Sequence, residues 1–134
     1  MIQTGDSFET TFSFSQDQVR AFAEVSGDHN PVHVDEEAAK AEGFPGPIVH
    51  GILGGSIFSR ILGNDFPGPG TVYLKQKLDF RKPLFPGVEY KAIVKVTRVM
   101  PERHIAQLST EVVGLEGERP LITGEAMVMN AKRI

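Results

Sequence analysis

The chain has 134 residues, of which 40% are hydrophobic, and carries 14 basic and 17 acidic side chains but no cysteine. This length predicts a single domain, residues 1–134, that can bury a core but is short for a deep substrate cavity within one subunit. The lack of cysteine excludes disulfides, thiolate nucleophiles and thiolate metal sites. The mixed charge, without a long block of one sign, argues against nucleic acid as the main partner.

The amino-terminal stretch Met-Ile-Gln-Thr-Gly-Asp has no basic segment followed by an apolar one, and no apolar run approaches the length that spans a bilayer. We therefore expect a cytoplasmic protein with no membrane partner.

The first elements are a strand and a helix. Apolar and polar residues alternate from Phe8 to Phe14, which is the period of a half-buried strand. Ser15 stands three residues before Gln18, which predicts a capping box at the start of a helix. Gly27 predicts the end of this helix.

The next segment contains the first candidate for chemistry. Asp28 and His33 are separated by an Asn-Pro turn, and Gly27 and Pro31 forbid a continuous helix across it. A compact turn can bring the carboxylate and the imidazole to one water molecule, where both can move protons. The alternative is ordinary turn chemistry, because Asp after a helix-ending Gly and Asn before Pro are common in turns.

Two further helices are predicted. A short one runs from an Asp35 cap to Glu42, with Gly43 as its stop. After a Phe-Pro-Gly-Pro connector, a second begins at Gly51 and continues to Gly63, and its apolar residues spread over so much of the helical wheel that we expect burial nearly all round. Its small residues would let a sheet or another backbone approach closely; these are Gly54, Gly55 and Ser56.

The rest of the chain predicts strands. One runs from Val72 to Phe80, with Val72, Leu74, Gln76, Leu78 and Phe80 as one alternate set. Three longer β segments follow, at about 88–100, 103–114 and 120–130, separated by Pro101-Glu102 and by a turn rich in Gly and Glu before residue 119. Together these elements fit an α+β domain with a long antiparallel sheet around one buried helix.

The residues from Phe22 to His33 read Phe-Ala-Glu-Val-Ser-Gly-Asp-His-Asn-Pro-Val-His, which resembles the hydratase 2 motif of (R)-specific enoyl-CoA hydratases in the MaoC-like dehydratase family. The similarity continues through Pro47–Gly51, Leu74–Phe80 and Pro83–Gly87. It implies a hot-dog fold, a homodimer and the reversible syn hydration of trans-2-enoyl-CoA to (R)-3-hydroxyacyl-CoA. It also implies a place between fatty-acid oxidation and polyhydroxyalkanoate or related pathways.

The resemblance assigns roles to particular residues. Asp28 is expected to act as the base toward water, His33 to hold that water and deliver a proton, and the backbone amide of Gly51 to bind the thioester oxygen. The acid and base labels of the pair can be exchanged. On local sequence alone, Gly51 is as readily explained by a tight start of the helix, whose first amides lack intrahelical acceptors.

Other residues receive supporting roles. We expect Asn30 to brace the turn or orient Asp28. We expect His50 to have a structural role or to support the residues that contact the substrate. Candidates for the acyl pocket wall are Ile52, Leu53 and Ser56, although packing explains them equally well. His29 and His104 are interpreted as a turn and a strand residue, and four scattered histidines predict no metal site. No metal or redox cofactor is expected, because coenzyme A belongs to the substrate.

Three alternatives remain for the activity. A dehydratase acting on acyl carrier protein shares the chemistry. A hot-dog acyl-CoA thioesterase would aim its base at the carbonyl carbon. A non-catalytic acyl-CoA-binding domain would keep the pocket without the chemistry, and the presence of both Asp28 and His33 argues against it.

Overall fold

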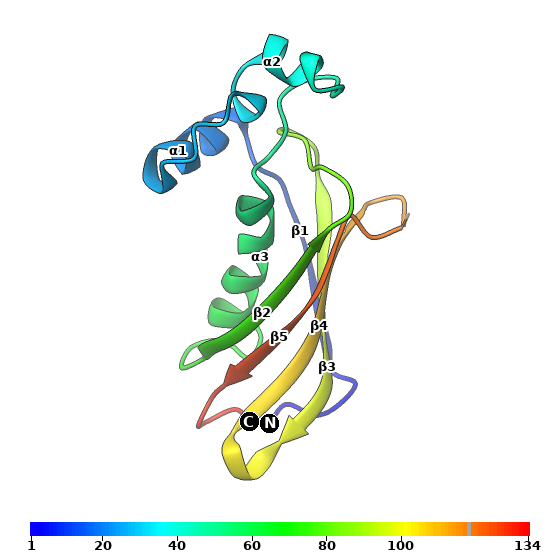
Figure 1. Cartoon of the computed structure of the whole chain (residues 1–134). Coiled ribbons are helices and arrows are strands. Elements are labelled where there is room, and N and C mark those ends of the chain that lie inside the picture. Colours follow the sequence, from blue (N-terminus) through cyan, green and yellow to red (C-terminus); the bar gives the residue numbers. More distant parts are fainter. Residues whose placement is uncertain (118) are drawn as a thin grey trace.

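The computed structural model describes residues 1–117 and 119–134, and shows one antiparallel sheet curved around a central helix (Figure 1). Its elements follow in chain order as β1 (Ser7–Phe12), α1 (Gln16–Ser26), a 3₁₀ turn (Pro31–His33), α2 (Glu36–Ala41), α3 (Gly51–Asn64), β2 (Val72–Phe80), β3 (Tyr90–Met100), a second 3₁₀ turn (Pro101–Arg103), β4 (Ile105–Gly114) and β5 (Ile122–Met129). The sheet order is β1-β3-β4-β5-β2, with every pair antiparallel. This is the α+β hot-dog arrangement, and the predicted fold class is confirmed.

The core lies between α3 and the inner face of the sheet. Buried apolar side chains of α3, among them Phe58, belong to one cluster with buried residues of the strands such as Leu108 and Val128. The glycines of α3 let the sheet come close, because a Cβ on Gly55 would stand 2.7 Å from Leu78 Cδ1 and one on Gly54 would stand 3.2 Å from Ile122 Cδ1. The predicted close approach at these two positions is confirmed.

The expectation that α3 is buried nearly all round is wrong. Ile52, Ser56 and Ser59 are exposed, and Ile52 retains 61% of its accessible surface. These positions recur at helical spacing on one side of α3, so they form a single stripe. The sheet curves around only the opposite side of the helix, and nothing within this subunit covers the stripe over the described residues.

Strand β2 forms an edge of the sheet and contains an irregularity. Tyr73 pairs with Val128 and Lys75 with Met127, so that Leu74 is an extra residue. Such a bulge shifts the side-chain alternation by one residue. The single alternate set that we predict along this strand is therefore wrong before the bulge, and Tyr73 shares the inner side with Gln76, to which its hydroxyl donates a hydrogen bond.

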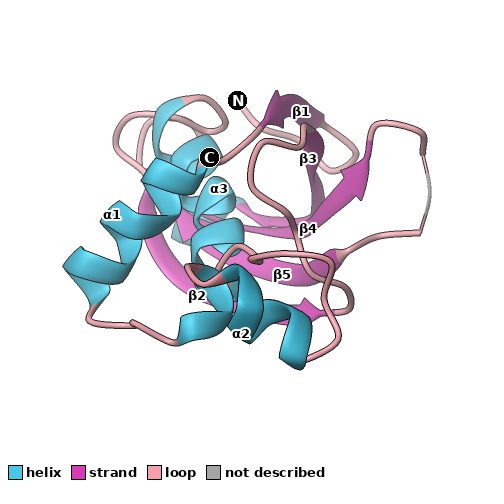
Figure 2. Ribbon diagram, turned by 90° about the horizontal axis from the view of Figure 1, so that it is seen from above, coloured by secondary structure: helices cyan, strands magenta, loops and turns pink. Residues whose placement is uncertain are grey.

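Helices α1 and α2 lie beyond the end of the sheet at which α3 begins (Figures 1 and 2). The capping box predicted at Ser15 and Gln18 is present, and Gly27 ends α1 with a φ of 79°. Asp35 caps α2 by accepting from two backbone amides, as predicted. None of the helices in the described residues is long and apolar enough to cross a membrane. The predicted turn between β4 and β5 includes residue 118, which lies outside the described residues.

Candidate active site

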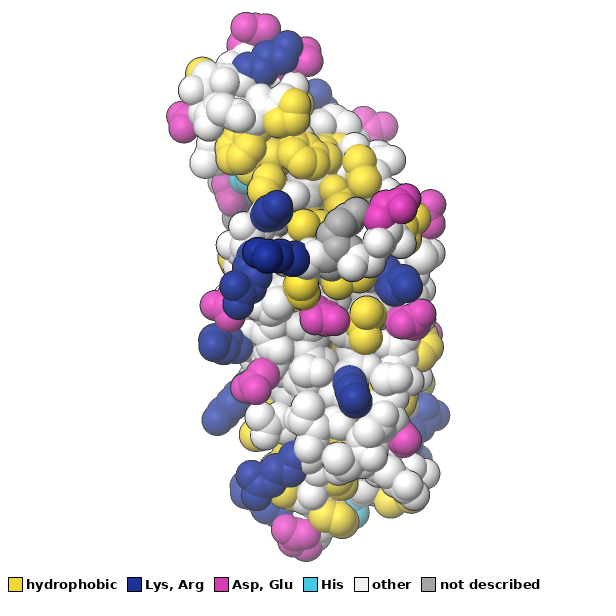
Figure 3. Space-filling view, turned by 90° about the vertical axis from the view of Figure 1, so that its right-hand side faces the viewer, with side chains coloured by type: hydrophobic (Ala, Val, Ile, Leu, Met, Phe, Trp, Pro, Cys, Tyr) yellow, Lys and Arg dark blue, Asp and Glu magenta, His cyan; other side chains and the backbone are white. Residues whose placement is uncertain are grey.

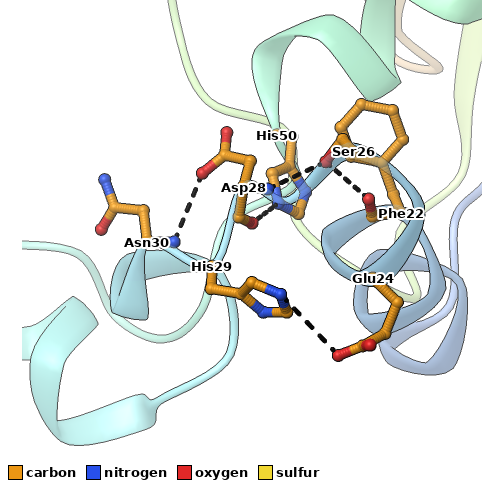
Figure 4. Close-up of polar contacts among 7 residues, drawn as sticks. All are labelled: Phe22, Glu24, Ser26, Asp28, His29, Asn30 and His50. Atoms are coloured by element: carbon orange, nitrogen blue, oxygen red, sulfur yellow. Dashed lines mark hydrogen bonds and ion pairs between the residues drawn. The ribbon is translucent and has the colours of Figure 1, made fainter.

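The site begins where α1 ends. Gly27 adopts a left-handed conformation that turns the chain away from the helix axis, and its N–H donates to Ala23 O at 2.9 Å. Ser26 Oγ accepts from the Asp28 N–H at 3.1 Å and donates to Phe22 O at 2.6 Å (Figure 4). These bonds fix the backbone of Asp28 directly after the helix, with its side chain exposed.

Asn30 holds the turn with two different groups. Its backbone N–H donates to Asp28 Oδ1 at 3.3 Å, while its own Oδ1 accepts from the Val32 N–H at 3.2 Å and caps the 3₁₀ turn. The expectation that Asn30 braces the turn is confirmed. The group that donates to the Asp28 carboxylate is the main-chain N–H of Asn30, while the side-chain oxygen of Asn30 accepts from Val32.

His33 ends this turn and is buried, with 8% of its surface exposed. Its Nδ1 lies 2.8 Å from Ile48 O. A carbonyl only accepts hydrogen bonds, so Nδ1 carries the proton and Nε2 is the ring atom left for proton transfer. A side-chain bond from Gln16 to His33 O, 2.9 Å long, ties the turn to the start of α1.

His50 lies behind this pair and is 2% exposed. Its Nε2 donates to Asp28 O at 3.0 Å, and its ring stacks on His33 with centroids 3.8 Å apart and planes inclined by 26°. Phe22 also packs against His50, with the centroids of the two rings 4.8 Å apart. Within the described residues Nδ1 of His50 has no hydrogen-bond partner. The predicted supporting position of His50 agrees with these contacts.

The turn brings the predicted pair together. One carboxylate oxygen of Asp28 and one ring nitrogen each of His33 and His50 lie within 4.8 Å of one another. By distance alone these atoms could surround an ion. A metal ligand must direct its in-plane lone pair at the ion from about 2 Å. The near-parallel stack keeps the two imidazole planes apart, which disfavours shared coordination by the two rings.

The amino end of α3 supplies the remaining part of the site. Gly51 is the first residue of the helix, and no acceptor for its N–H occurs in residues 1–117 and 119–134. A cavity of about 340 Å³ opens here, with His33 and Gly51 in its wall. A Cβ on Gly51 would stand 3.0 Å from the Phe80 ring, so a side chain at this position would force that ring to shift by a few tenths of an ångström. Asp28 does not line the cavity in the isolated subunit and stands exposed beside it.

The predicted pocket residues do not line this cavity. Leu53 is buried in the core with 8% exposure, whereas Ile52 and Ser56 face outward on the exposed stripe. The wall instead includes residues that the sequence analysis does not assign to the pocket; these are Phe80, Arg81, Lys82, Leu84 and Ile122 together with Gly54. The signal for Phe80 and Leu84 lies in the segments Leu74–Phe80 and Pro83–Gly87, which belong to the resemblance. The sequence of α3 alone does not show how the helix is rotated about its axis, and this rotation decides which of its residues face the cavity.

The two remaining histidines lie away from this cluster. His29 is exposed and its Nε2 lies 3.8 Å from a Glu24 carboxylate oxygen. His104 is not on a strand as predicted. It has a φ of 57° just before β4, and its ring bonds to Ile134 O.

A curved sheet around a helix, with a carboxylate and an imidazole beside the open amino end of that helix, defines a hot-dog protein that carries groups suited to proton transfer. The chain matches the MaoC like domain family over residues 2–116, and it belongs to that family.

Named relatives share most of its length. The chain is 40% identical to the (R)-specific enoyl-CoA hydratase of Aeromonas caviae, over 95% of this chain and 94% of that protein. It is 38% identical to the mitochondrial 3-hydroxyacyl-[acyl-carrier-protein] dehydratase of Arabidopsis thaliana, over 94% and 76% of the two chains. The solved structure of the (R)-hydratase from A. caviae involved in PHA biosynthesis superposes with a TM-score of 0.91 at 40% identity, covering 96% of this chain and 97% of that one.

Proposed function

We propose that the protein is an (R)-specific enoyl-CoA hydratase, a hydro-lyase that reversibly adds water to trans-2-enoyl-CoA to give (R)-3-hydroxyacyl-CoA. The observation that carries this proposal is the convergence of Asp28 and His33 beside the open amino end of α3. The relatives named above, hydratases and a dehydratase of 3-hydroxyacyl thioesters, support the same reaction.

The reaction needs three groups. The Asp28 carboxylate accepts a proton from water as the water oxygen bonds to C3. The Gly51 N–H donates to the thioester oxygen, on which negative charge develops, and His33 Nε2 delivers a proton to C2. His33 donates only in its protonated form, because its Nδ1–H is already engaged by Ile48 O. If the acid and base roles are exchanged, neutral His33 accepts the proton from water and protonated Asp28 donates a proton to C2.

The stereochemistry follows from the size of the cluster. Both groups lie within 4.8 Å of each other, so they reach the same water on one face of the double bond. We expect syn addition for this reason. Base, acid and oxyanion donor all come from the protein, and the proposal needs no metal or redox cofactor.

A single assay tests the proposal. Loss of the conjugated enoyl absorbance of crotonyl-CoA, with chiral analysis of the 3-hydroxybutyryl product, should show hydration to the (R) isomer. The thioesterase alternative would instead release free coenzyme A, which a thiol reagent detects. A non-catalytic binding domain would show neither change at any enzyme concentration, and that result would sink the proposal.

The carrier is a separate question, because hydration of an acyl-carrier-protein thioester uses the same three groups. The Arabidopsis relative is described as acting on the carrier-protein form. We favour coenzyme A for this chain, and a comparison of kcat/KM for crotonyl-CoA and crotonyl-acyl carrier protein decides between them.

We also propose a homodimer that continues the sheet through β2. Among the residues that the structure describes, this strand pairs with β5 alone, and Val72 and Leu74 on it retain 49% and 42% of their surface. An unprotected edge of nine residues with apolar side chains is unfavourable in an isolated subunit. The exposed stripe of α3 (Ile52, Ser56 and Ser59) would be covered by the same partner, so Ile52 and Ser56 remain candidates for contact with an acyl chain near the interface. The location in the cytoplasm stays a prediction.

A further inference from the structure

Two side chains in the wall of the catalytic cavity have no part in the proposed hydration. Arg81 and Lys82 follow β2 directly and line the same cavity as Gly51 and His33. They also line a second hollow of about 420 Å³ together with Arg119, Pro120 and Thr123. The two hollows share this pair of residues, so Arg81 and Lys82 form a rim between the place of the chemistry and the outer surface.

The rim is held in position by the start of β5. The backbone N–H groups of Arg81 and Lys82 both donate to Leu121 O, at 2.9 and 3.2 Å. Arg81 Nε donates to Thr123 Oγ1 at 3.1 Å, which fixes the guanidinium group against the sheet. A cation fixed in this way loses less freedom when it binds an anion.

The charged side chains that line the two hollows are all cations over the described residues, while Asp79 and Glu111 lie opposite Thr123 on the neighbouring strands. Arg81, Lys82 and Arg119 are exposed, and over residues 1–117 and 119–134 none of them forms an ion pair. No Asp or Glu of the described chain lines either hollow. The protein as a whole carries a formal net charge of −3, so this cluster is a local departure from its overall charge. On the face drawn in Figure 3, Lys and Arg side chains gather directly below an apolar surface.

We propose that Arg81, Lys82 and Arg119 bind the phosphate groups of the coenzyme A moiety of the substrate. This moiety would extend out of the catalytic cavity past Arg81 and Lys82. Arg and Lys are the side chains that bind phosphate, Arg through paired N–H groups and Lys as a point charge. This inference rests on the proposed hydratase activity, because a thioester held at the Gly51 N–H places the rest of the thiol carrier along the same cavity.

The test compares two substrates that differ only in the phosphorylated nucleotide. Crotonyl-CoA carries the phosphates, and crotonyl-pantetheine has none. The variant Lys82→Ala/Arg119→Ala removes two cations together, because each exposed charge-assisted contact contributes only modestly. We expect the ratio of kcat/KM for crotonyl-CoA to kcat/KM for crotonyl-pantetheine to fall at least about tenfold at low salt. Most of this fall should come from a higher KM for crotonyl-CoA. The difference should shrink as salt is added. Lys95→Ala, which removes an exposed cation from β3 away from the rim, is the matched control and should leave the ratio at the parental value.

Each other outcome has a distinct meaning. An unchanged ratio in the double variant overturns the phosphate site while the hydratase proposal stands. Equal losses with both substrates would assign these cations to the fold or the cavity, and would also overturn it. A loss confined to crotonyl-acyl carrier protein would overturn it by assigning them to an acidic carrier protein instead. If the parent protein hydrates neither crotonyl thioester, the proposed function itself fails.

Discussion

At the scale of single residues, the site depends on which atoms are already engaged. Nδ1 of His33 is bonded to Ile48 O, which leaves Nε2 for chemistry. The Asp28 carbonyl is held by His50, and its carboxylate by the Asn30 N–H, so main chain and side chain of Asp28 have separate supports. These contacts orient each catalytic group and still leave Nε2 of His33 and the second carboxylate oxygen of Asp28 for chemistry.

We expect Asp28→Asn and His33→Gln each to lower the hydration rate by about 10² to 10⁴-fold, because each removes a proton-transfer group with little change of shape. Thermal unfolding and circular dichroism should stay near the parental values, particularly for the exposed Asp28. Near-parental turnover of either folded variant, measured with crotonyl-CoA, would show that the residue is not catalytic.

A matched pair of leucines tests the cavity wall. Leu53 and Leu84 are both buried members of the core cluster, but only Leu84 also lines the cavity. Leu84→Ala and Leu53→Ala should each lower the free energy of unfolding by about 2 to 5 kcal/mol. Only Leu84→Ala should shift the preference toward longer acyl chains, and gradually, since a methylene in such a pocket is worth about 1 to 3 kcal/mol. The kcat/KM series from crotonyl-CoA to dodecenoyl-CoA measures this, and a shift in the Leu53 variant instead would restore Leu53 to the pocket wall.

The residues differ in how far the sequence predicts them. Gly27 and Pro31 restrict the backbone locally, so the convergence of Asp28 and His33 follows from a short segment. In contrast, which residues of α3 contact the cavity depends on how the whole helix is rotated against the sheet, and this is not set by any short segment. Leu53 and Leu84 are both apolar and both belong to the core, and only the packing shows that Leu84 also reaches the cavity.

At the scale of elements, the bulge in β2 creates a polar cluster on the inner side of the sheet. It turns Tyr73 toward Gln76, and Gln76 Nε2 in turn lies 3.1 Å from Oγ1 of the buried Thr110. The strand itself is predicted by its alternation. The bulge is not, because one extra residue in a paired strand depends on the register with β5 and leaves no mark in the pattern of β2 alone.

This environment gives a pH prediction. Burial raises the pKa of Tyr73 from 10.0 to about 12. Below about pH 10 the folded and unfolded chains both keep this proton, so it contributes nothing to the pH dependence of stability. Between about pH 10 and 12 the unfolded chain releases the proton first, and the free energy of unfolding should fall as pH rises. The chain has two tyrosines and no tryptophan, so Tyr90→Phe leaves Tyr73 alone as the chromophore. Its tyrosinate absorbance should appear near pH 12, and a midpoint near 10 would show that Tyr73, which keeps 38% of its surface exposed, is too well solvated for this shift.

At the scale of the whole molecule, two incomplete surfaces adjoin the site. β2 ends the sheet with an unpaired edge, and α3 lies beside it with an exposed apolar residue, Ile52, next to Gly51 (Figure 1). The sequence predicts long strands and a central helix but not which strand lies at the edge, because strand order is a property of the pairing. A partner at this edge would narrow the open side of the catalytic cavity, so assembly and activity should be linked.

That link can be tested with two matched substitutions. Leu74→Asp places a charge on the β2 edge, and Leu115→Asp places the same charge on a similarly exposed leucine after β4. If β2 forms the interface, the parent and Leu115→Asp should have twice the mass of one chain by light scattering. Leu74→Asp should have the mass of one chain and lose most of its turnover of crotonyl-CoA, since a buried unpaired charge strongly disfavours an interface. A parent protein that is monomeric and fully active at assay concentration would contradict the dimer, and an intact dimer of the Leu74 variant would place the interface elsewhere.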